Sequence, residues 1–260
     1  LVMCLGYLSA PPETLNVEPL ADYHVYLDMQ FRILATDSAF RGLYGVMEYM
    51  ADYADEESLR YAHKLFRHYC IEGQRVPFSR DPYRLRHLQN PDFAKGLDGW
   101  HAIPAEAGAI EANSMDGFSW LQGRYPRTRT GDTFAVLTRS ASGPNRLEQN
   151  IEALQAGRLY SVKYITANLD DLDREQTTQV STAIEGGEIL DEYTIQFAYP
   201  SCYSHESGPY TRETPAWFTF HRTVFRATAN AARLSLADGL GPAGQRIALN
   251  FVEVQPFHAP

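Results

Sequence analysis

Residues 90–100 read Asn-Pro-Asp-Phe-Ala-Lys-Gly-Leu-Asp-Gly-Trp, and at this stretch the sequence changes its periodicity. Pro91 prevents a helix from running into the stretch, because proline lacks an amide hydrogen and disfavours helical geometry in the residue before it. Gly96 and Gly99 allow tight turns where a Cβ atom would clash. The apolar residues between these turns, ending with Trp100, predict a cluster that closes one end of a new domain.

After this stretch the sequence predicts short strands separated by turn residues. Alternation is clearest over residues 158–168, where Tyr160, Val162 and Tyr164 share one face. Within residues 190–199 we expect the apolar side chains Tyr193, Ile195 and Phe197 to point inward. The predicted strands are 107–112, 117–122, 132–139, 145–152, 158–168, 177–184, 190–199, 216–227, 231–237 and 245–255. This spacing predicts an all-β antiparallel sandwich over residues 90–260.

Two short motifs make this region similar to a known family. The opening Asn90–Trp100 and the closing Leu-Asn-Phe-Val-Glu-Val at residues 249–254 resemble the ends of galactose-binding-like jelly rolls of the CenC carbohydrate-binding type. The resemblance covers about residues 90–256 and is carried mainly by these two ends. It implies a jelly-roll sandwich that binds a polysaccharide or oligosaccharide.

The same resemblance implies a structural calcium ion close to Asp92 and Asn250. Two positions depart from the family pattern: Ala94 stands where the family often has Glu, and Asn250 where it often has Asp. Since calcium needs six or more oxygen ligands, the site would lack two acidic ones. No other cofactor is expected.

Before Asn90 the pattern is different. An apolar run at residues 1–8 and another at residues 41–50 suit strands buried on both faces. Apolar residues recur at helical spacing over residues 20–36, and Asp55 is placed to cap a helix that runs to about Cys70. The order strand, helix, strand, helix predicts a parallel sheet with right-handed crossovers.

Two strands cannot close a barrel, so residues 1–73 look like the last two units of a (β/α)8 barrel whose earlier units would precede this segment. This part resembles the C-terminal end of a glycoside-hydrolase-like barrel. In such a barrel the catalytic groups lie at the C-terminal ends of the strands, where Glu48 is the one carboxylate. Glycosidases usually need two carboxylates, so the second would belong to the missing upstream portion of the polypeptide. The alternative is that Glu48 only hydrogen-bonds a loop or a substrate hydroxyl.

Residues 74–89, rich in arginine and proline, are predicted to link the two parts. Their length and aromatic residues favour packing along the junction, and a mobile tether is the alternative.

Bulk properties exclude several classes of function. A net charge of -9 over 260 residues disfavours nucleic acid and anionic membrane surfaces as partners. No apolar run reaches the roughly 20 residues that a membrane-spanning helix needs. The apolar start has no basic region before it, so no signal peptide is identified, although sugar binding would suit an extracellular or periplasmic location. The three widely spaced cysteines indicate neither a disulfide framework nor a zinc site.

Sugar binding calls for an exposed aromatic ring and for planar polar groups around the hydroxyls. Residues 118–129 and the long loop 200–215 offer both. The candidate residues are Trp120, Gln122, Arg124, Tyr125, Tyr203 and Tyr210. The alternative for each aromatic ring is packing in the core or within a loop.

Three functions remain open at this point. The first is carbohydrate binding by a module at the C-terminal end of a glycoside-hydrolase-like protein, which would bind without hydrolysing. The second is a non-catalytic structural or adhesion module that supports the barrel. The third is an intact glycosidase with a cleft between the two parts.

Overall fold

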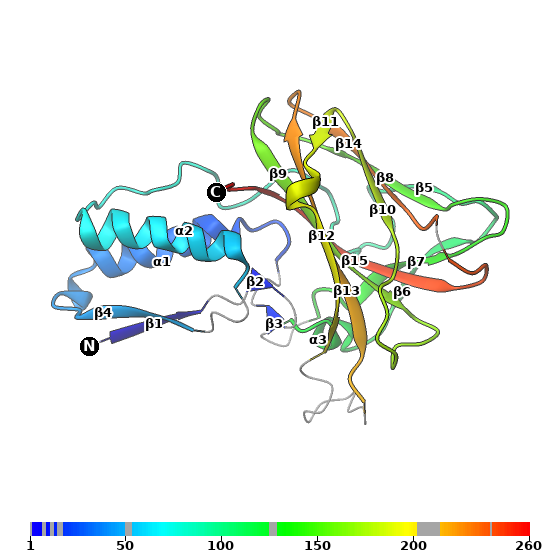
Figure 1. The fold of residues 1–260 in the computed structure, drawn as a ribbon, viewed down its shortest axis with the longest axis horizontal. Coiled ribbons are helices and arrows are strands. Elements are labelled where there is room, and N and C mark those ends of the chain that lie inside the picture. The colour runs from blue at the N-terminus through cyan, green and yellow to red at the C-terminus, as the bar shows by residue number, and fades with distance from the viewer. Residues whose placement is uncertain are drawn as a thin grey trace.

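The structure of the protein is a computed structural model. It describes residues 2–6, 9–10, 13–14, 18–49, 54–124, 129–201, 214–239 and 241–260. A helical part with a small parallel sheet lies beside a larger β-sandwich, and the chain returns to the helical part at its C-terminus (Figure 1).

The N-terminal part has the strand–helix–strand–helix order that the sequence predicts. Strands β1 (Val2–Gly6) and β4 (Gly45–Tyr49) pair in parallel. Helix α1 (Tyr23–Thr36) joins them, and helix α2 (Glu56–Phe66) follows and continues as a π-helical turn, Arg67–Ile71. Asp55 caps α2 as expected, its carboxylate accepting the amide of Ser58 at 2.8 Å. A two-residue hairpin, β2 (Ser9–Ala10) with β3 (Glu13–Thr14), lies between β1 and α1.

The described residues cover one face of the parallel sheet. Leu5 packs against the buried faces of α1 and α2, around Leu27, Phe31 and Leu65. On the opposite face Val2 and Met47 are exposed. Two strands form no barrel within the described residues, so the barrel remains a prediction.

The larger part is an antiparallel sandwich, as predicted. One sheet has the order β10-β14-β8-β5, and the other has the order β11-β13-β9-β15-β7-β6 with β12 beside β13. The strands are β5 (His101–Ile103), β6 (Ile110–Ser114), β7 (Thr133–Thr138), β8 (Arg146–Ile151), β9 (Leu159–Asn168), β10 (Ser181–Glu185), β11 (Gly187–Ile189), β12 (Ile195–Pro200), β13 (Trp217–Ala227), β14 (Ala232–Ala237) and β15 (Arg246–Pro256).

The stretch 90–100 closes the sandwich core in the predicted manner. The rings of Phe93 and Trp100 stack at 5.2 Å within the main apolar cluster between the two sheets. Asn90 ties the turns together, since its side-chain amide donates to the carbonyls of Gly96 and Asp98 at 2.8 and 2.9 Å. Gly96 adopts a φ of +62°, which favours glycine.

Two strand predictions are wrong. Residues 117–122 form a short helix, α3 (Phe118–Leu121), because Gly117 turns the chain with a φ of +82°. Ile195 and Phe197 point outward, each 37 % exposed. They lie on the outer face of β12, which pairs with β13 among the described residues. In that part of the chain, the apolar cluster on this face buries Tyr199 of the same strand and leaves Ile195 and Phe197 partly exposed.

The outer face of the seven-stranded sheet is covered from both ends. At one end α3 packs with Phe134, Tyr199 and Phe218 in a second apolar cluster. At the other end the N-terminal part buries Ser161 and Lys163 of β9. Both faces of β9 are therefore buried, and one of them is buried by a separate part of the chain.

Candidate functional site

Three residues predicted to bind sugar lie on or just after α3. Gln122 is 1 % exposed, and its amide donates to the carbonyls of Phe118 and Gly131, both at 3.2 Å. Arg124 is buried, and its guanidinium lies 3.0 Å from the centre of the Phe251 ring. Trp120 is half-buried. The side chains of Gln122 and Arg124 therefore support the fold and do not reach the surface.

The other predicted binding residues, Tyr125, Tyr203 and Tyr210, lie outside the described residues. Glu48 lies on β4 opposite Leu5, and only its backbone is described. These assignments remain predictions.

Asn250 uses both of its side-chain atoms in the predicted calcium region. Its amide donates to the carbonyl of Gly131 at 2.6 Å, and its oxygen accepts the amide of Phe251 at 2.7 Å. Asp92 accepts the amide of Ala94 at 3.4 Å. Among the described residues no group of three or more His, Cys, Asp or Glu side chains is arranged to hold a metal. The thiols of Cys4 and Cys70 are free and exposed.

The junction between the two parts carries charged groups that the sequence did not identify. Strands β1 and β4 run toward the sandwich, so their C-terminal ends and the N-termini of α1 and α2 face it (Figure 1). Asp55, at the start of α2, lies 3.6 Å from the Lys163 ammonium and 3.8 Å from the Arg222 guanidinium. Burial opposes ionisation of Asp55, but Lys163 and the bonds from Ser58 outweigh it and lower the pKa to about 2.

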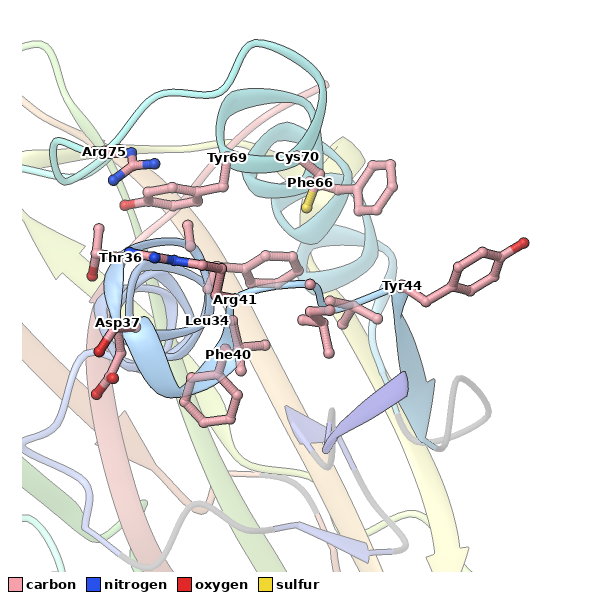
Figure 2. Close-up of a pocket in the computed structure, with 17 residues that line it drawn as sticks. Leu34, Thr36, Asp37, Phe40, Arg41, Tyr44, Phe66, Tyr69, Cys70 and Arg75 are labelled. Carbon is pink, nitrogen blue, oxygen red and sulfur yellow. The ribbon is translucent and has the colours of Figure 1, made fainter. Parts of the chain in front are cut away.

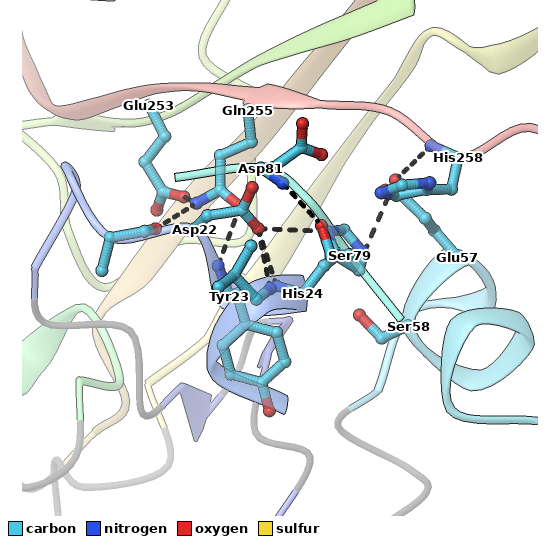
Figure 3. A network of polar contacts seen from close by, with 12 residues as sticks. Asp22, Tyr23, His24, Glu57, Ser58, Ser79, Asp81, Glu253, Gln255 and His258 are labelled. Carbon is cyan, nitrogen blue, oxygen red and sulfur yellow. Dashed lines mark hydrogen bonds and ion pairs between the residues drawn. The ribbon is translucent and has the colours of Figure 1, made fainter. Parts of the chain in front are cut away.

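A second group of buried side chains surrounds the start of α1 (Figure 3). The His24 imidazole lies 3.6 Å from a Glu57 oxygen and 3.8 Å from an Asp22 oxygen. Burial raises the pKa of Glu57 to about 7 and that of Asp22 to about 6, and burial lowers the pKa of His24. Glu57 also accepts the amide of His258 at 2.7 Å, which ties the C-terminus to α2.

These groups hold the two parts together, and they are not arranged as an open catalytic site. Asp22, His24 and Glu57 are each at most 3 % exposed, so a substrate cannot reach them in this arrangement. On the sandwich side, Gln255 donates to the carbonyl of Ala21 at 3.2 Å and accepts the amide of Tyr23 at 3.4 Å. The polar contacts therefore explain why the outer sheet face is buried despite its charges.

A hollow of about 560 Å³ lies within the N-terminal part, between the ends of α1 and α2 and the start of β4 (Figure 2). Rings line much of it, including Phe40, Phe66 and Tyr69. It lies at the N-terminal end of β4, whereas parallel sheets place ligands at the C-terminal ends of their strands. Tyr44, which also lines the hollow, is 90 % exposed. The position of the hollow in the fold therefore does not favour it as the ligand site.

The hollow best suited to a polar ligand lies along the linker. It has a volume of about 400 Å³ and is bounded by residues 81–87, by the turn between β8 and β9, and by Pro256. Its polar lining groups are Asp81, Arg84, Arg86, His87, Gln155 and Arg158, and its apolar ones are Pro82, Leu85, Ala153, Tyr160 and Pro256. We call it the linker cleft. Its size and its mixture of apolar surface with convergent planar polar groups suit a small polar ligand.

Residues 85–88 of the linker are bonded to both parts of the protein. Leu85 donates its amide to the carbonyl of Leu20 at 2.7 Å, and Glu152 donates its amide to the carbonyl of His87 at 3.0 Å. Leu88 is buried in the sandwich core. The prediction that residues 74–89 pack along the junction therefore holds for this stretch of the linker.

Sequence reasoning missed the residues of the cleft and of the junction for a common reason. Arg84 and Arg86 belong to the linker, whereas Arg158 lies more than 70 residues further along the chain. The signal in the sequence is the alternation of the two arginines with Leu85 and His87, which is typical of an extended segment with one buried and one exposed face. No local pattern indicates that Asp55 would meet Lys163.

Comparisons with known proteins give low-identity structural neighbours. A carbohydrate-binding module, TmCBM61 in complex with β-1,4-galactotriose, is 14 % identical over 66 % of this chain and 99 % of its own, with a TM-score of 0.37. The N-terminal cellulose-binding domain of Cellulomonas fimi β-1,4-glucanase C is 15 % identical over 65 % of this chain and 99 % of its own, with a TM-score of 0.33. The arabinose-bound α-L-arabinofuranosidase MgGH51 is 13 % identical over 65 % of this chain, with a TM-score of 0.38, and the present chain covers 26 % of its length.

No protein-family model matches the sequence, and no curated protein matches it. Among the described helices, none has the length and apolar character needed to cross a membrane.

Proposed function

We propose that this protein binds carbohydrate and that the linker cleft is its binding site. The observation that carries the proposal is the set of planar polar side chains gathered at the cleft: three guanidinium groups, the imidazole of His87 and the amide of Gln155. Such groups donate and accept in fixed planes, as sugar hydroxyls require. The exposed apolar surface of Pro82 supplies contact area for the C–H face of a pyranose. The resemblance of Asn90–Trp100 to the opening of carbohydrate-binding jelly rolls agrees with this function.

The test is a glycan array followed by calorimetry on the full chain. Substituting Gln155→Trp would place an indole at the mouth of the cleft and should abolish binding. Gln196→Trp is the matched control, because Gln196 is also exposed but lies on β12, away from the cleft. Failure of the wild-type chain to bind any glycan, neutral or charged, would refute the proposal. Binding that survives Gln155→Trp would move the site elsewhere, for example to the predicted residues Tyr203 and Tyr210.

We further propose that the N-terminal part belongs to a glycoside-hydrolase-like barrel, and that in the present form the protein binds without hydrolysing. This proposal is supported by the parallel pairing of β1 with β4 and by the exposed apolar residues on the uncovered face. A parallel sheet is normally covered on both faces, and an exposed apolar face of this kind associates. Light scattering of the 260-residue chain should therefore show self-association. A monodisperse monomer would contradict the barrel proposal, and hydrolysis of aryl glycosides by this chain would favour the intact-enzyme alternative. An extracellular or periplasmic location is part of the same proposal.

A further inference from the structure

The linker cleft has a positive charge that contrasts with the rest of the protein. Arg84, Arg86 and Arg158 line it together with a single carboxylate, that of Asp81. The chain as a whole has a net charge of -9. A local excess of cations in an acidic protein concentrates anions at that place.

Two of the three arginines are available to a ligand. Arg158 is already engaged, since its guanidinium donates in a bidentate arrangement to Asp81, with Nη1 at 2.7 Å from Oδ1. Arg84 and Arg86 form no ion pair with any residue in the described part of the chain, and both side chains are exposed. The charges of the paired Arg158 and Asp81 nearly cancel, so the excess positive charge of the cleft comes from Arg84 and Arg86.

The backbone holds these two arginines at a fixed spacing. Leu85 and His87 are buried while Arg84 and Arg86 are exposed, so the segment alternates as a strand does. It is bonded on both sides: to the carbonyl of Leu20 through the amide of Leu85, and to the β8–β9 turn through His87. Residues two apart in an extended segment lie roughly 6.5–7 Å from one another, so neighbouring guanidinium groups can meet one anionic group or two on adjacent units of an oligomer.

His87 is set to accept a hydrogen bond and not to add charge. Its Nδ1 lies 2.7 Å from the carbonyl oxygen of Glu152, which can only accept, so Nδ1 carries the hydrogen and Nε2 is the acceptor. Burial lowers the pKa of His87, which favours the neutral ring. His87 lines the cleft with 7 % of its surface exposed, so its Nε2 offers a ligand hydroxyl a small accepting surface and offers an anion no charge.

We propose that the linker cleft selects an anionic sugar, bearing a carboxylate or a sulfate ester, and that Arg84 and Arg86 bind the anionic group. This inference rests on the proposed carbohydrate-binding function and narrows its ligand class. Guanidinium forks match the two oxygens of a carboxylate and those of a sulfate ester. The accepting nitrogen of His87 and the exposed apolar Pro82 distinguish the cleft from a site for a free inorganic anion.

The test compares matched ligands on the full chain by calorimetry. Trigalacturonate and its fully methyl-esterified form have the same ring skeleton and differ in charge, and a sulfated trisaccharide separates sulfate from carboxylate recognition. We expect the acid to bind about tenfold or more tightly than the ester, with an affinity that falls as salt is raised. In the double variant R84Q/R86Q this preference should disappear. The control R32Q/R146Q removes two exposed arginines that lie outside the cleft and should leave the preference intact.

The outcomes separate this inference from the proposed function. Equal binding of the acid, the ester and the sulfated trisaccharide by the wild-type chain would overturn the anionic preference and leave carbohydrate binding in place. Preference for an anionic ligand that survives R84Q/R86Q would overturn the assignment of these arginines. If only the sulfated sugar is preferred, the proposal holds with sulfate as the anionic group. Absence of binding to every glycan would refute the proposed function and this inference together.

Discussion

Substitution of Asp55 offers the sharpest test of how the two parts are joined. Its carboxylate performs two tasks that can be separated. It caps α2 by accepting the Ser58 amide, and it lies 3.6 Å from Lys163 and 3.8 Å from Arg222 on the sandwich. Asparagine is as good a helix cap as aspartate, so Asp55→Asn removes the charge and keeps the cap. Asp55→Ala removes both.

The size of the charge contribution follows from the pKa. A fall from 3.8 to about 2 corresponds to about 2 kcal/mol of stability at neutral pH. Substitution also leaves Lys163 buried without its nearest partner, and breaking a buried pair typically costs about 3–5 kcal/mol. Glu57 is also close enough to influence the charge on Lys163 and offsets part of this loss. We therefore expect Asp55→Asn to cost about 3 kcal/mol, and Asp55→Ala about 1 kcal/mol more for the lost cap.

The measurement is urea unfolding followed by circular dichroism at pH 7. Asp37→Asn is the matched control, because Asp37 also accepts a backbone amide at the start of a helical turn, at 2.9 Å, but is exposed. That change should stay within about 0.5 kcal/mol of the wild type.

The pH dependence supplies a second check on Asp55. Because its pKa is depressed in the folded state, its stabilisation is present above pH 3.8 and is lost as the pH falls toward about 2. The gap between wild type and Asp55→Asn should narrow over that range. A stability of Asp55→Asn equal to the wild type at pH 7 would refute the view that this contact joins the two parts.

Three further predictions concern other parts of the structure. Burial raises the pKa of Glu57 from 4.5 to about 7, so its contribution to the free energy of unfolding is complete below pH 4.5 and is lost as the pH rises through 7. Glutamine does not titrate, so in chemical unfolding the stability of Glu57→Gln relative to the wild type should rise by about 3 kcal/mol between pH 4.5 and pH 8. Leu88→Ala should lower the free energy of unfolding by about 2–5 kcal/mol in the same assay, because Leu88 is buried in the sandwich core. An unchanged stability would indicate that the linker does not pack on the sandwich. A chelator should leave the melting temperature unchanged, because both side-chain atoms of Asn250 are hydrogen-bonded to backbone groups. A lower melting temperature with chelator would support a bound calcium ion.

The fold could be predicted where local patterns decide it. The capping residue Asp55 and the turns of residues 90–100 identify their structures directly, because the same few residues make the contacts. The strand predicted over residues 231–237 forms as β14, where Ala232, Leu234 and Leu236 are buried and alternate with less buried neighbours. Residues 117–122 could not be assigned from their sequence, because a segment as short as the four residues of α3 can be helical or extended according to its surroundings. Packing of Phe118 on Phe134 and Phe218 fixes α3 as a helix.

The site was harder to predict because it depends on contacts between distant segments. Aromatic residues in a polar stretch, such as Trp120, match both a sugar platform and a packed helix, and periodicity does not distinguish the two. Arg124 shows the difficulty well: a charged residue in a turn is expected at the surface, yet its guanidinium stacks on Phe251. Arg84 and Arg86 lie in residues 74–89, and the composition of that stretch predicted only a link between the two parts of the chain.

The position of the linker cleft couples ligand binding to the packing of the two parts. The backbone of Leu85, between the two cleft arginines, is bonded to Leu20 ahead of α1, and Arg158 of the sandwich is paired with Asp81 of the linker. If the two parts separated, the walls of the cleft would separate with them. A ligand that binds only the assembled cleft must therefore stabilise the junction, by an amount set by its concentration and affinity. By the same linkage, weakening the junction at Asp55 must lower the apparent affinity of the cleft, although Asp55 does not line it.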